Sequence, residues 1–202
     1  MATEEQTAYN ATRVLYSGVA HRAGQRLTIP NRVVSKLSFP IYRYGSPTGN
    51  VTFTIRSNKD DSVLVSKVLG DASTLETSVT WEEATFATPA NIDEEVSMLF
   101  EFSGGDSSNY VCYRIQNTDV KESEFYILYL SSYTNYTIQD SAYIYTYTPA
   151  ITYRHQTTLT PTHLYEGTLK PKHNYARTLE ASHLYEAKME ASHKYTARME
   201  AK

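Results

Sequence analysis

Histidine and tyrosine recur at a fixed spacing of ten residues in the last quarter of this 202-residue chain. His163, His173, His183 and His193 are each followed two positions later by a tyrosine. Imidazole rings bind metal ions or form hydrogen bonds. Histidines ten residues apart on one extended strand are separated by about 33 Å, so a single strand cannot bring two of them to one ion. We therefore expect packed imidazoles, with no metal site and no cofactor.

A third column of the repeat holds leucine or methionine, and the first block inverts the order of histidine and tyrosine. The repeated positions together form a predicted assembly face on the tail. Its members are Tyr153, His155, Leu159, His163, Tyr165, Leu169, His173, Tyr175, Leu179, His183, Tyr185, Met189, His193, Tyr195 and Met199.

Catalytic motifs are missing from the sequence. It contains no G-x-S-x-G, no H-E-x-x-H and no phosphate-binding loop. His21 is the only histidine before residue 155, which argues against a catalytic triad, and we expect no enzyme. Asp60, Asp61 and Asp106 lie in predicted turns, where calcium binding is an alternative to a purely structural role.

A period of ten distinguishes a helix from a strand. Ten residues rotate an α-helix by about 1000°, roughly 80° short of three turns, so the repeated side chains would face no constant partner. Ten is an even number, so a strand presents the same face in every repeat. The same parity continues back to Tyr143 without a slip. We therefore expect the tail to be extended.

The junctions between repeats carry no Asn-Gly or Asp-Gly hairpin signal. Five short blocks also make few coils, which argues against a β-solenoid. The remaining prediction is a long, nearly straight arm. Such an arm is not stable alone, and one repeat of about 33 Å is close to the diameter of a domain of this size, about 38 Å. We expect it to dock along successive copies of the protein.

The first three quarters of the chain predict an antiparallel β-sandwich, because short apolar alternations are separated by turn residues. Trp81 lies on one of these alternations and is expected in the core. The predicted strands are Thr12–Tyr16, Arg26–Ile29, Val33–Tyr42, Val51–Arg56, Val63–Val68, Val79–Phe86, Val96–Phe102, Tyr110–Ile115, Glu124–Tyr129 and Tyr143–Tyr147.

Three segments resemble the choice-of-anchor type of jelly-roll module, which occurs in secreted, surface and phage structural proteins. They are Leu37–Ile55 with its Gly-Ser-Pro-Thr-Gly-Asn-Val turn, Val79–Phe86 and Tyr110–Ile115. The resemblance implies a jelly-roll sandwich with a binding or assembly role and no fixed catalytic residues. We therefore expect an all-β chain, with a jelly-roll domain and short N-terminal arm over residues 1–147 and an extended repeat tail over 148–202.

The formal net charge of −3 divides unequally along the chain. Residues 1–150 carry a balance of −6 and residues 151–202 a balance of +3, which favours attraction between tail and body. The acidic body and the lack of a basic cluster argue against nucleic acid as a partner. We see no signal peptide at the start and no apolar run of about 20 residues, so membrane insertion is not expected.

We expect a self-assembling structural subunit of a helical filament, viral or extracellular, with copies of itself as the partner. The alternative is a carbohydrate-binding or adhesin module, for which Tyr42 and Tyr44, or Tyr133 and Tyr136, would form the platform. Glycans are then the second candidate partner. Candidate N-glycosylation sites occur at Asn10, Asn50 and Asn135.

Overall fold

The computed structural model describes residues 1–150, 155–159, 175–181 and 197–201. The chain divides into two compact units, the body (Met1–Ala150) and the tail (Ile151–Lys202). The sequence placed the end of the body at residue 147. In the described residues every element is a β-strand except one short 3-10 turn, η1 (Ala72–Thr74). The all-β prediction is therefore confirmed.

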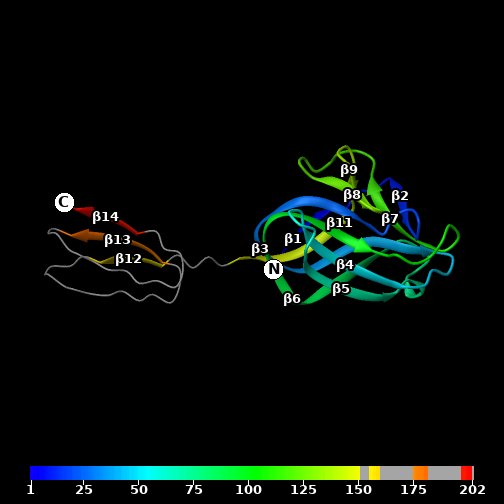
Figure 1. The fold of residues 1–202 in the computed structure, drawn as a ribbon, viewed down its shortest axis with the longest axis horizontal. Coiled ribbons are helices and arrows are strands. Elements are labelled where there is room, and N and C mark those ends of the chain that lie inside the picture. The colour runs from blue at the N-terminus through cyan, green and yellow to red at the C-terminus, as the bar shows by residue number, and fades with distance from the viewer. Residues whose placement is uncertain (151–154, 160–174, 182–196, 202) are drawn as a thin grey trace. The chain divides into compact units, whose positions relative to one another are not determined.

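Eleven strands of the body form one continuous hydrogen-bonded sheet, in which neighbouring strands run antiparallel. Figure 1 shows the sheet curling over on itself, with β8 and β9 beside one another. The strands are β1 (Ala2–Gln6), β2 (Ala11–Leu15), β3 (Arg22–Tyr44), β4 (Asn50–Ser57), β5 (Val63–Asp71), β6 (Thr80–Glu101), β7 (Tyr110–Gln116), β8 (Phe125–Tyr129), β9 (Tyr133–Tyr136), β10 (Asp140–Ser141) and β11 (Tyr143–Pro149).

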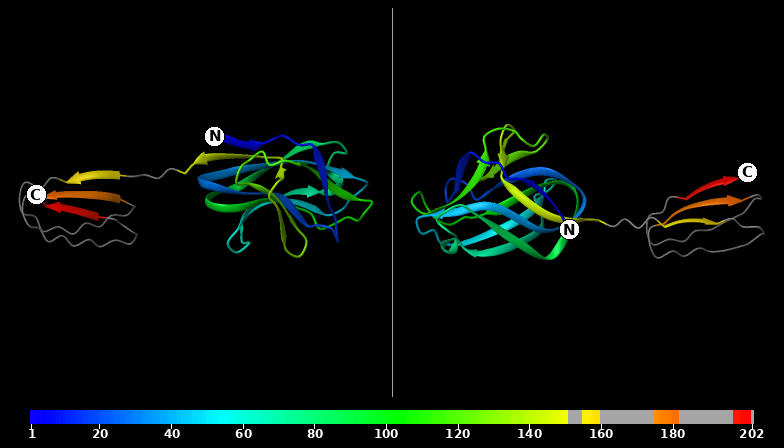
Figure 2. Two further views of the ribbon diagram at one scale, coloured as in Figure 1. Left: turned by 90° about the horizontal axis from the view of Figure 1, so that it is seen from above. Right: turned by 180° about the vertical axis from the view of Figure 1, so that it is seen from behind.

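Two long, curved strands organise the body, as both views in Figure 2 show. Strand β3 pairs with β6 along most of its length. Its other edge pairs first with β8, then with β11 and finally with β7. The far edge of β6 pairs with β4, which pairs in turn with β5. The long strands therefore connect all the shorter ones.

The sequence predicted two strands in place of β3 and two in place of β6. In the structure each pair is a single strand, and the predicted break within it is a bulge. The β3–β6 register shifts between Ile29 and Arg32. Pro30 donates no hydrogen bond, and Asn31 has a φ of 43°, so the ladder is interrupted there. The pairing shifts again between Val34 and Lys36. The chain bends at these points but stays in the sheet.

The core lies inside the curled sheet, where a chain of aromatic rings packs among buried leucine, isoleucine and valine side chains. Phe39, Phe53 and Phe100 are fully buried, with ring centroids 5.2 and 5.7 Å from that of Phe39. Tyr113 continues the chain of rings, 4.6 Å from Phe100. Trp81 is only half-buried and lies outside this core, so the prediction of a tryptophan anchor is wrong. Phenylalanine, tyrosine and aliphatic side chains fill the interior instead.

Three strands are described in the tail: β12 (His155–Leu159), β13 (Tyr175–Ala181) and β14 (Ala197–Ala201). They form a separate parallel sheet with β13 in the centre. The strand conformation that the even period predicts is confirmed for these three segments. The predicted single straight arm is not confirmed, because the described segments run side by side.

Candidate functional site

The repeats of the tail pair with one another in a fixed register. His155 lies opposite Tyr175, and Leu159 lies opposite Leu179. Leu179 lies opposite Met199 in turn. Both pairings join residues that are 20 positions apart, so neighbouring strands are separated by two decapeptides. The repeat therefore supplies its own strand partners, which satisfy backbone groups that a lone strand would leave unpaired.

Five members of the predicted assembly face lie in this sheet: His155, Leu159, Tyr175, Leu179 and Met199. The leucine and methionine positions align in one row across all three strands. The other ten members lie outside the described residues. They are Tyr153, His163, Tyr165, Leu169, His173, His183, Tyr185, Met189, His193 and Tyr195.

A second candidate interface lies in the body, where the N-terminal strand β1 covers the edge of β11. The two strands pair antiparallel from Ala2 opposite Tyr147 to Gln6 opposite Tyr143. Figures 1 and 2 both place β1 at the outside of the body beside β11. We call the edge of β11 and the side chains that receive β1 the β1 slot. Strand β1 is not predicted from the sequence, because Thr-Glu-Glu-Gln has no apolar alternation.

Glu4 is the charged anchor of β1 in this slot. Its carboxylate forms an ion pair with Arg32 and accepts a hydrogen bond of 3.0 Å from the hydroxyl of Tyr145. The guanidinium of Arg32 also lies 4.1 Å from the ring centroid of Tyr147. Burial alone would raise the pKa of Glu4, but the hydrogen bonds from Arg32 and Tyr145 outweigh it and lower that pKa. Glu4 is therefore ionised when it is docked.

Gln6 is the neutral anchor, and only 4% of it is exposed. Its amide Nε2 donates to the carbonyl oxygen of Ser141 at 3.3 Å. The amide N–H of Ser141 donates in turn to the Oε1 of Gln25 at 2.7 Å, and Gln25 donates to Asp140 at 2.6 Å. Gln25, Asp140 and Ser141 are all fully buried. Gln6 thus completes a buried polar chain beneath β1.

Glu124 lies in the loop before β8, at the end of this polar chain. Its Oε2 accepts a hydrogen bond of 2.7 Å from the hydroxyl of Tyr143. Burial raises the pKa of Glu124 despite the hydrogen bonds from Tyr143 and Gln25. Burial and the neighbouring carboxylate of Glu124 also raise the pKa of Tyr143. Two carboxylates with opposite pKa shifts, Glu4 and Glu124, therefore lie near the slot.

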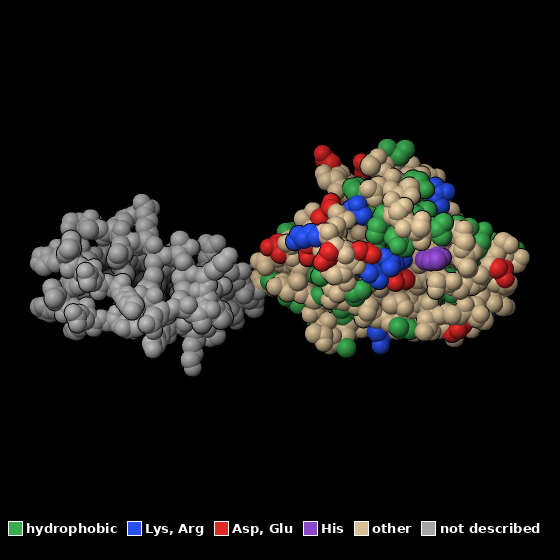
Figure 3. All heavy atoms as spheres, viewed as in Figure 1, with side chains coloured by type: hydrophobic (Ala, Val, Ile, Leu, Met, Phe, Trp, Pro, Cys, Tyr) green, Lys and Arg blue, Asp and Glu red, His purple; other side chains and the backbone are tan. Residues whose placement is uncertain are grey.

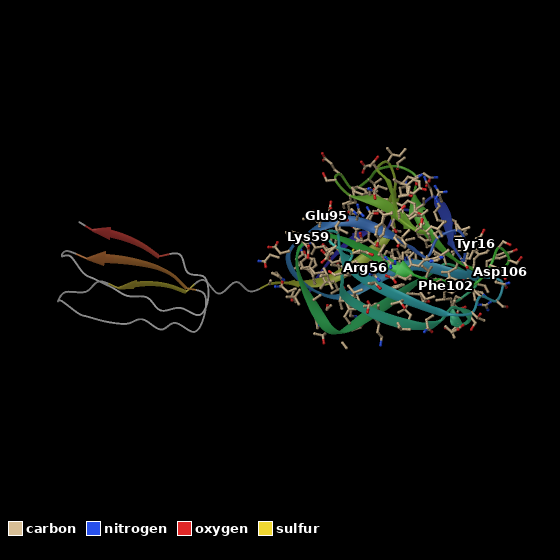
Figure 4. All side chains as sticks on the ribbon, viewed as in Figure 1. Tyr16, Arg56, Lys59, Glu95, Phe102 and Asp106 are labelled. Carbon is tan, nitrogen blue, oxygen red and sulfur yellow. The ribbon has the colours of Figure 1, made fainter. Side chains whose placement is uncertain are left out.

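A third polar cluster fastens the β4–β5 turn to the body. Arg22 contacts Asp61 at 2.8 Å, and the hydroxyl of Tyr133 donates to the same carboxylate at 2.7 Å. Arg56, labelled in Figure 4, contacts Glu101 at 2.9 Å. Both arginines are paired with carboxylates, so these ion pairs hold the turn against the sheet. The hydroxyl of Tyr133 is therefore engaged by Asp61 and Arg22 in this cluster.

The other predicted aromatic platform is more open. Tyr44 is 56% exposed, and its ring stacks on Tyr110 with centroids 4.8 Å apart. The ring centroid of Tyr16, labelled in Figure 4, lies 6.0 Å from that of Tyr110. Tyr42 is half-buried, 5.6 Å from the guanidinium of Arg114. Tyr110 is half-buried like Tyr42, so Tyr44 is the exposed member of this aromatic group.

The acidic residues of the predicted turns serve as local hydrogen-bond acceptors. Asp60 accepts from the backbone and hydroxyl of Ser62, and Asp106 accepts from the backbone N–H of Ser108 at 2.7 Å. Across the described ranges, no group of three or more His, Cys, Asp or Glu side chains could hold a metal ion. Asn10, Asn50 and Asn135 are all exposed, as a glycan would require.

Figure 3 shows charged side chains of both signs interspersed on one face of the body. The part of the chain that the structure describes contains no helix with the length and apolar character needed to cross a membrane. Comparison with known proteins identifies no family, since no family model matches the sequence and no curated protein is significantly similar to it.

Proposed function

We propose that this protein is a self-assembling structural subunit whose repeat tail joins copies by β-strand addition into an open filament. The observation that supports it is the 20-residue parallel register of β12, β13 and β14. A sheet built from near-identical repeats can accept a further repeat without a change of register. The body is then a jelly-roll module of the kind its sequence resembles, and the filament is viral or extracellular.

The outer edges of the tail sheet carry this proposal. In the described segments, β13 lies between β12 and β14, which each pair on one side only. Unpaired strand edges are templates for pairing with another chain. The strand after β14 in such a ladder can be β12 of the next copy, because both carry a leucine or methionine in the same row. A contact that joins two different edges does not close, and it generates a filament.

Removing the tail tests this function. We expect a variant that lacks residues 151–202 to remain folded, because the buried core lies within the body. It should form no filaments in negative-stain electron microscopy and should scatter light as a monomer. Filaments of unchanged length and number from this variant would refute the role of the tail.

A matched pair of point variants tests the register itself. Leu179→Asp places a charge in the row that includes Leu159 and Met199, where it should abolish or strongly reduce assembly. Thr178→Asp adds the same charge one position away, on the other face of the strand, opposite Arg198. We expect Thr178→Asp to assemble like the wild type. Equal effects of the two variants would contradict a register-specific role for the leucine row.

Carbohydrate binding is the second candidate function, and the exposed ring of Tyr44, stacked on Tyr110, favours it. Sugars bind to open aromatic faces, and Tyr44 offers one. A glycan array probed with the body alone, residues 1–150, tests this function against Tyr44→Ala. Binding that is lost in the variant would support the adhesin function, and an absence of binding by the wild type would remove it.

A further inference from the structure

Strand β1 is attached to the body without any help from the hydrophobic core. Ala2, Thr3 and Glu5 are exposed, Gln6 is buried among polar partners, and no hydrophobic residue before Ala11 belongs to the buried core or packs against it. Among the described residues, β1 pairs with β11 alone. Elements with little apolar burial open locally at low cost, while the rest of the domain stays folded. The body can therefore release β1 without losing its core.

The β1 slot is nevertheless specific for its occupant. Glu4 matches Arg32 and Tyr145, and Gln6 reaches the backbone carbonyl of Ser141. An empty slot would leave the edge of β11 unpaired and Arg32 without its carboxylate. Such a slot selects the sequence Ala2–Gln6 over other strands. Every other copy of the chain carries the same sequence.

We propose that β1 is exchanged between copies, so that β1 of one chain fills the β1 slot of the next. This inference rests on the proposed self-assembly and names a second contact that serves it. The contacts made in exchange are the same as those within one chain, which is the condition for domain swapping. Thr7–Asn10, which join β1 to β2, are all exposed; Asn10 is held to Ile115 and Asn117 by hydrogen bonds, so Thr7, Ala8 and Tyr9 are the residues that would extend.

Proximity in an assembly favours the exchange. Strand β11 ends at Pro149, directly before the repeat tail begins at Ile151. Copies that are joined through their tails hold their slots at high local concentration, which turns exchange into an effectively intramolecular step. A strand that is released from one body then finds the slot of a neighbour.

Chains with one introduced cysteine test the exchange directly. Thr3 lies opposite Thr146 in the β1–β11 ladder, and directly opposed residues of an antiparallel pair are near disulfide distance. A Thr3→Cys chain mixed with a Thr146→Cys chain can form this disulfide only between two molecules. The native Cys112 is 3% exposed and should not compete. The two chains are mixed before assembly, assembled and then oxidised.

We expect a disulfide-linked dimer on non-reducing gels in at least tenfold excess over a control mixture of Thr3→Cys with Ser66→Cys. Ser66 is exposed on β5, which pairs with β4 and not with β1. An excess of dimer that disappears on reduction supports the exchange. Dimer yields equal to those of the control would overturn it. A chain with both Thr3→Cys and Thr146→Cys confirms that the pair is competent, since it must form the bond either within or between chains.

The result separates this inference from the proposed function. If filaments form and the mixed chains give no excess dimer, the tail proposal stands and strand exchange fails. If the variant without residues 151–202 still assembles and still gives the dimer in the mixed-cysteine experiment, exchange stands and the tail proposal fails. Glu4→Gln in both chains should speed the exchange, because it weakens β1 in every slot, and Glu5→Gln, which changes an exposed side chain of the same strand, should leave the rate unchanged.

Discussion

The Glu4→Gln substitution should loosen β1 while leaving the rest of the body intact. Glu4 holds the strand through its ion pair with Arg32 and the hydrogen bond from Tyr145. Hydrogen bonds to charged groups contribute about 1.5–3 kcal/mol. The two ion-pair side chains are 20% and 29% exposed, so solvent screening reduces the effect. We expect the docking of β1 to weaken by about 1–2 kcal/mol.

Amide hydrogen exchange is the suitable assay, because β1 opens without global unfolding. A loss of this size raises the population of the open strand by a factor of about 5–30. Exchange should therefore accelerate by that factor in β1 and along the edge of β11. Amides next to Phe53 and Phe100 in the core should keep the wild-type rate. The free energy of global unfolding, measured with urea, should change less than the free energy of local opening that exchange in β1 reports.

The pH dependence follows from the lowered pKa of Glu4. A carboxylate whose pKa is lower in the folded state contributes stability above its unfolded pKa, about 4.3. That contribution is lost as the pH falls through the folded pKa. The difference between wild type and Glu4→Gln should therefore be full at pH 7 and disappear in strong acid.

Glu5→Gln is the matched control, since Glu5 is exposed and lies in the same strand. It removes the same charge but no contact with Arg32. If both variants exchange at the same rate at pH 7, the ion pair does not hold β1, and our reasoning about the slot is refuted.

Two further predictions concern the body. Glu124→Gln should stabilise the protein at pH 7, because burial raises the pKa of this carboxyl. In the wild type, the cost of ionising Glu124 in the folded state is absent below its unfolded pKa and grows as the pH rises through its folded pKa. Urea unfolding should therefore show a higher free energy of unfolding for the variant at pH 7 and no gain at pH 4. Gly24→Ala should prevent folding or cost several kcal/mol of stability, because a Cβ atom there would lie 1.9 Å from the carbonyl oxygen of Met98. Circular dichroism measures the loss of folded structure. Gly18→Ala is the comparison, since a Cβ atom at Gly18 would meet nothing within 4 Å and only its φ of 91° adds local strain.

Alternation in the sequence predicted strands well wherever one face is buried. Val51, Phe53 and Ile55 alternate with polar residues, and all three are buried in β4. The period of two is a local signal, because each core residue must face the same side. The tail strands follow from the same rule, since an even repeat keeps its face constant.

Breaks inside strands could not be recognised from the sequence. Pro30 and Asn31 have the composition of a turn, and they form a bulge instead. A bulge and a turn use the same residues, and the choice depends on whether the chain continues beside the same partner. In β3 the partner on both sides of the bulge is β6. This pairing joins residues far apart in sequence and leaves no local signal.

The choice of strand partner was the main feature that the sequence did not indicate. A period of ten permits any even register, and it does not distinguish pairing with another molecule from pairing with a repeat 20 residues away. Strand β1 was missed for a related reason. Its residues are polar, and it is a strand because the edge of β11 accepts it. Backbone pairing, unlike side-chain burial, leaves little trace in the sequence.

Strand β11 connects the two proposed interfaces, and its tyrosines show how. Tyr143 and Tyr145 are fully buried, and their hydroxyls reach Glu124 and Glu4 at the polar edge of the core. One edge of β11 pairs with β3, which is built into the core, and the other pairs with β1, which is not. Its C-terminal end leads into the repeats. In the proposed exchange, the release of β1 from one edge of β11 would leave the pairing of the other edge with β3, and so the core, intact.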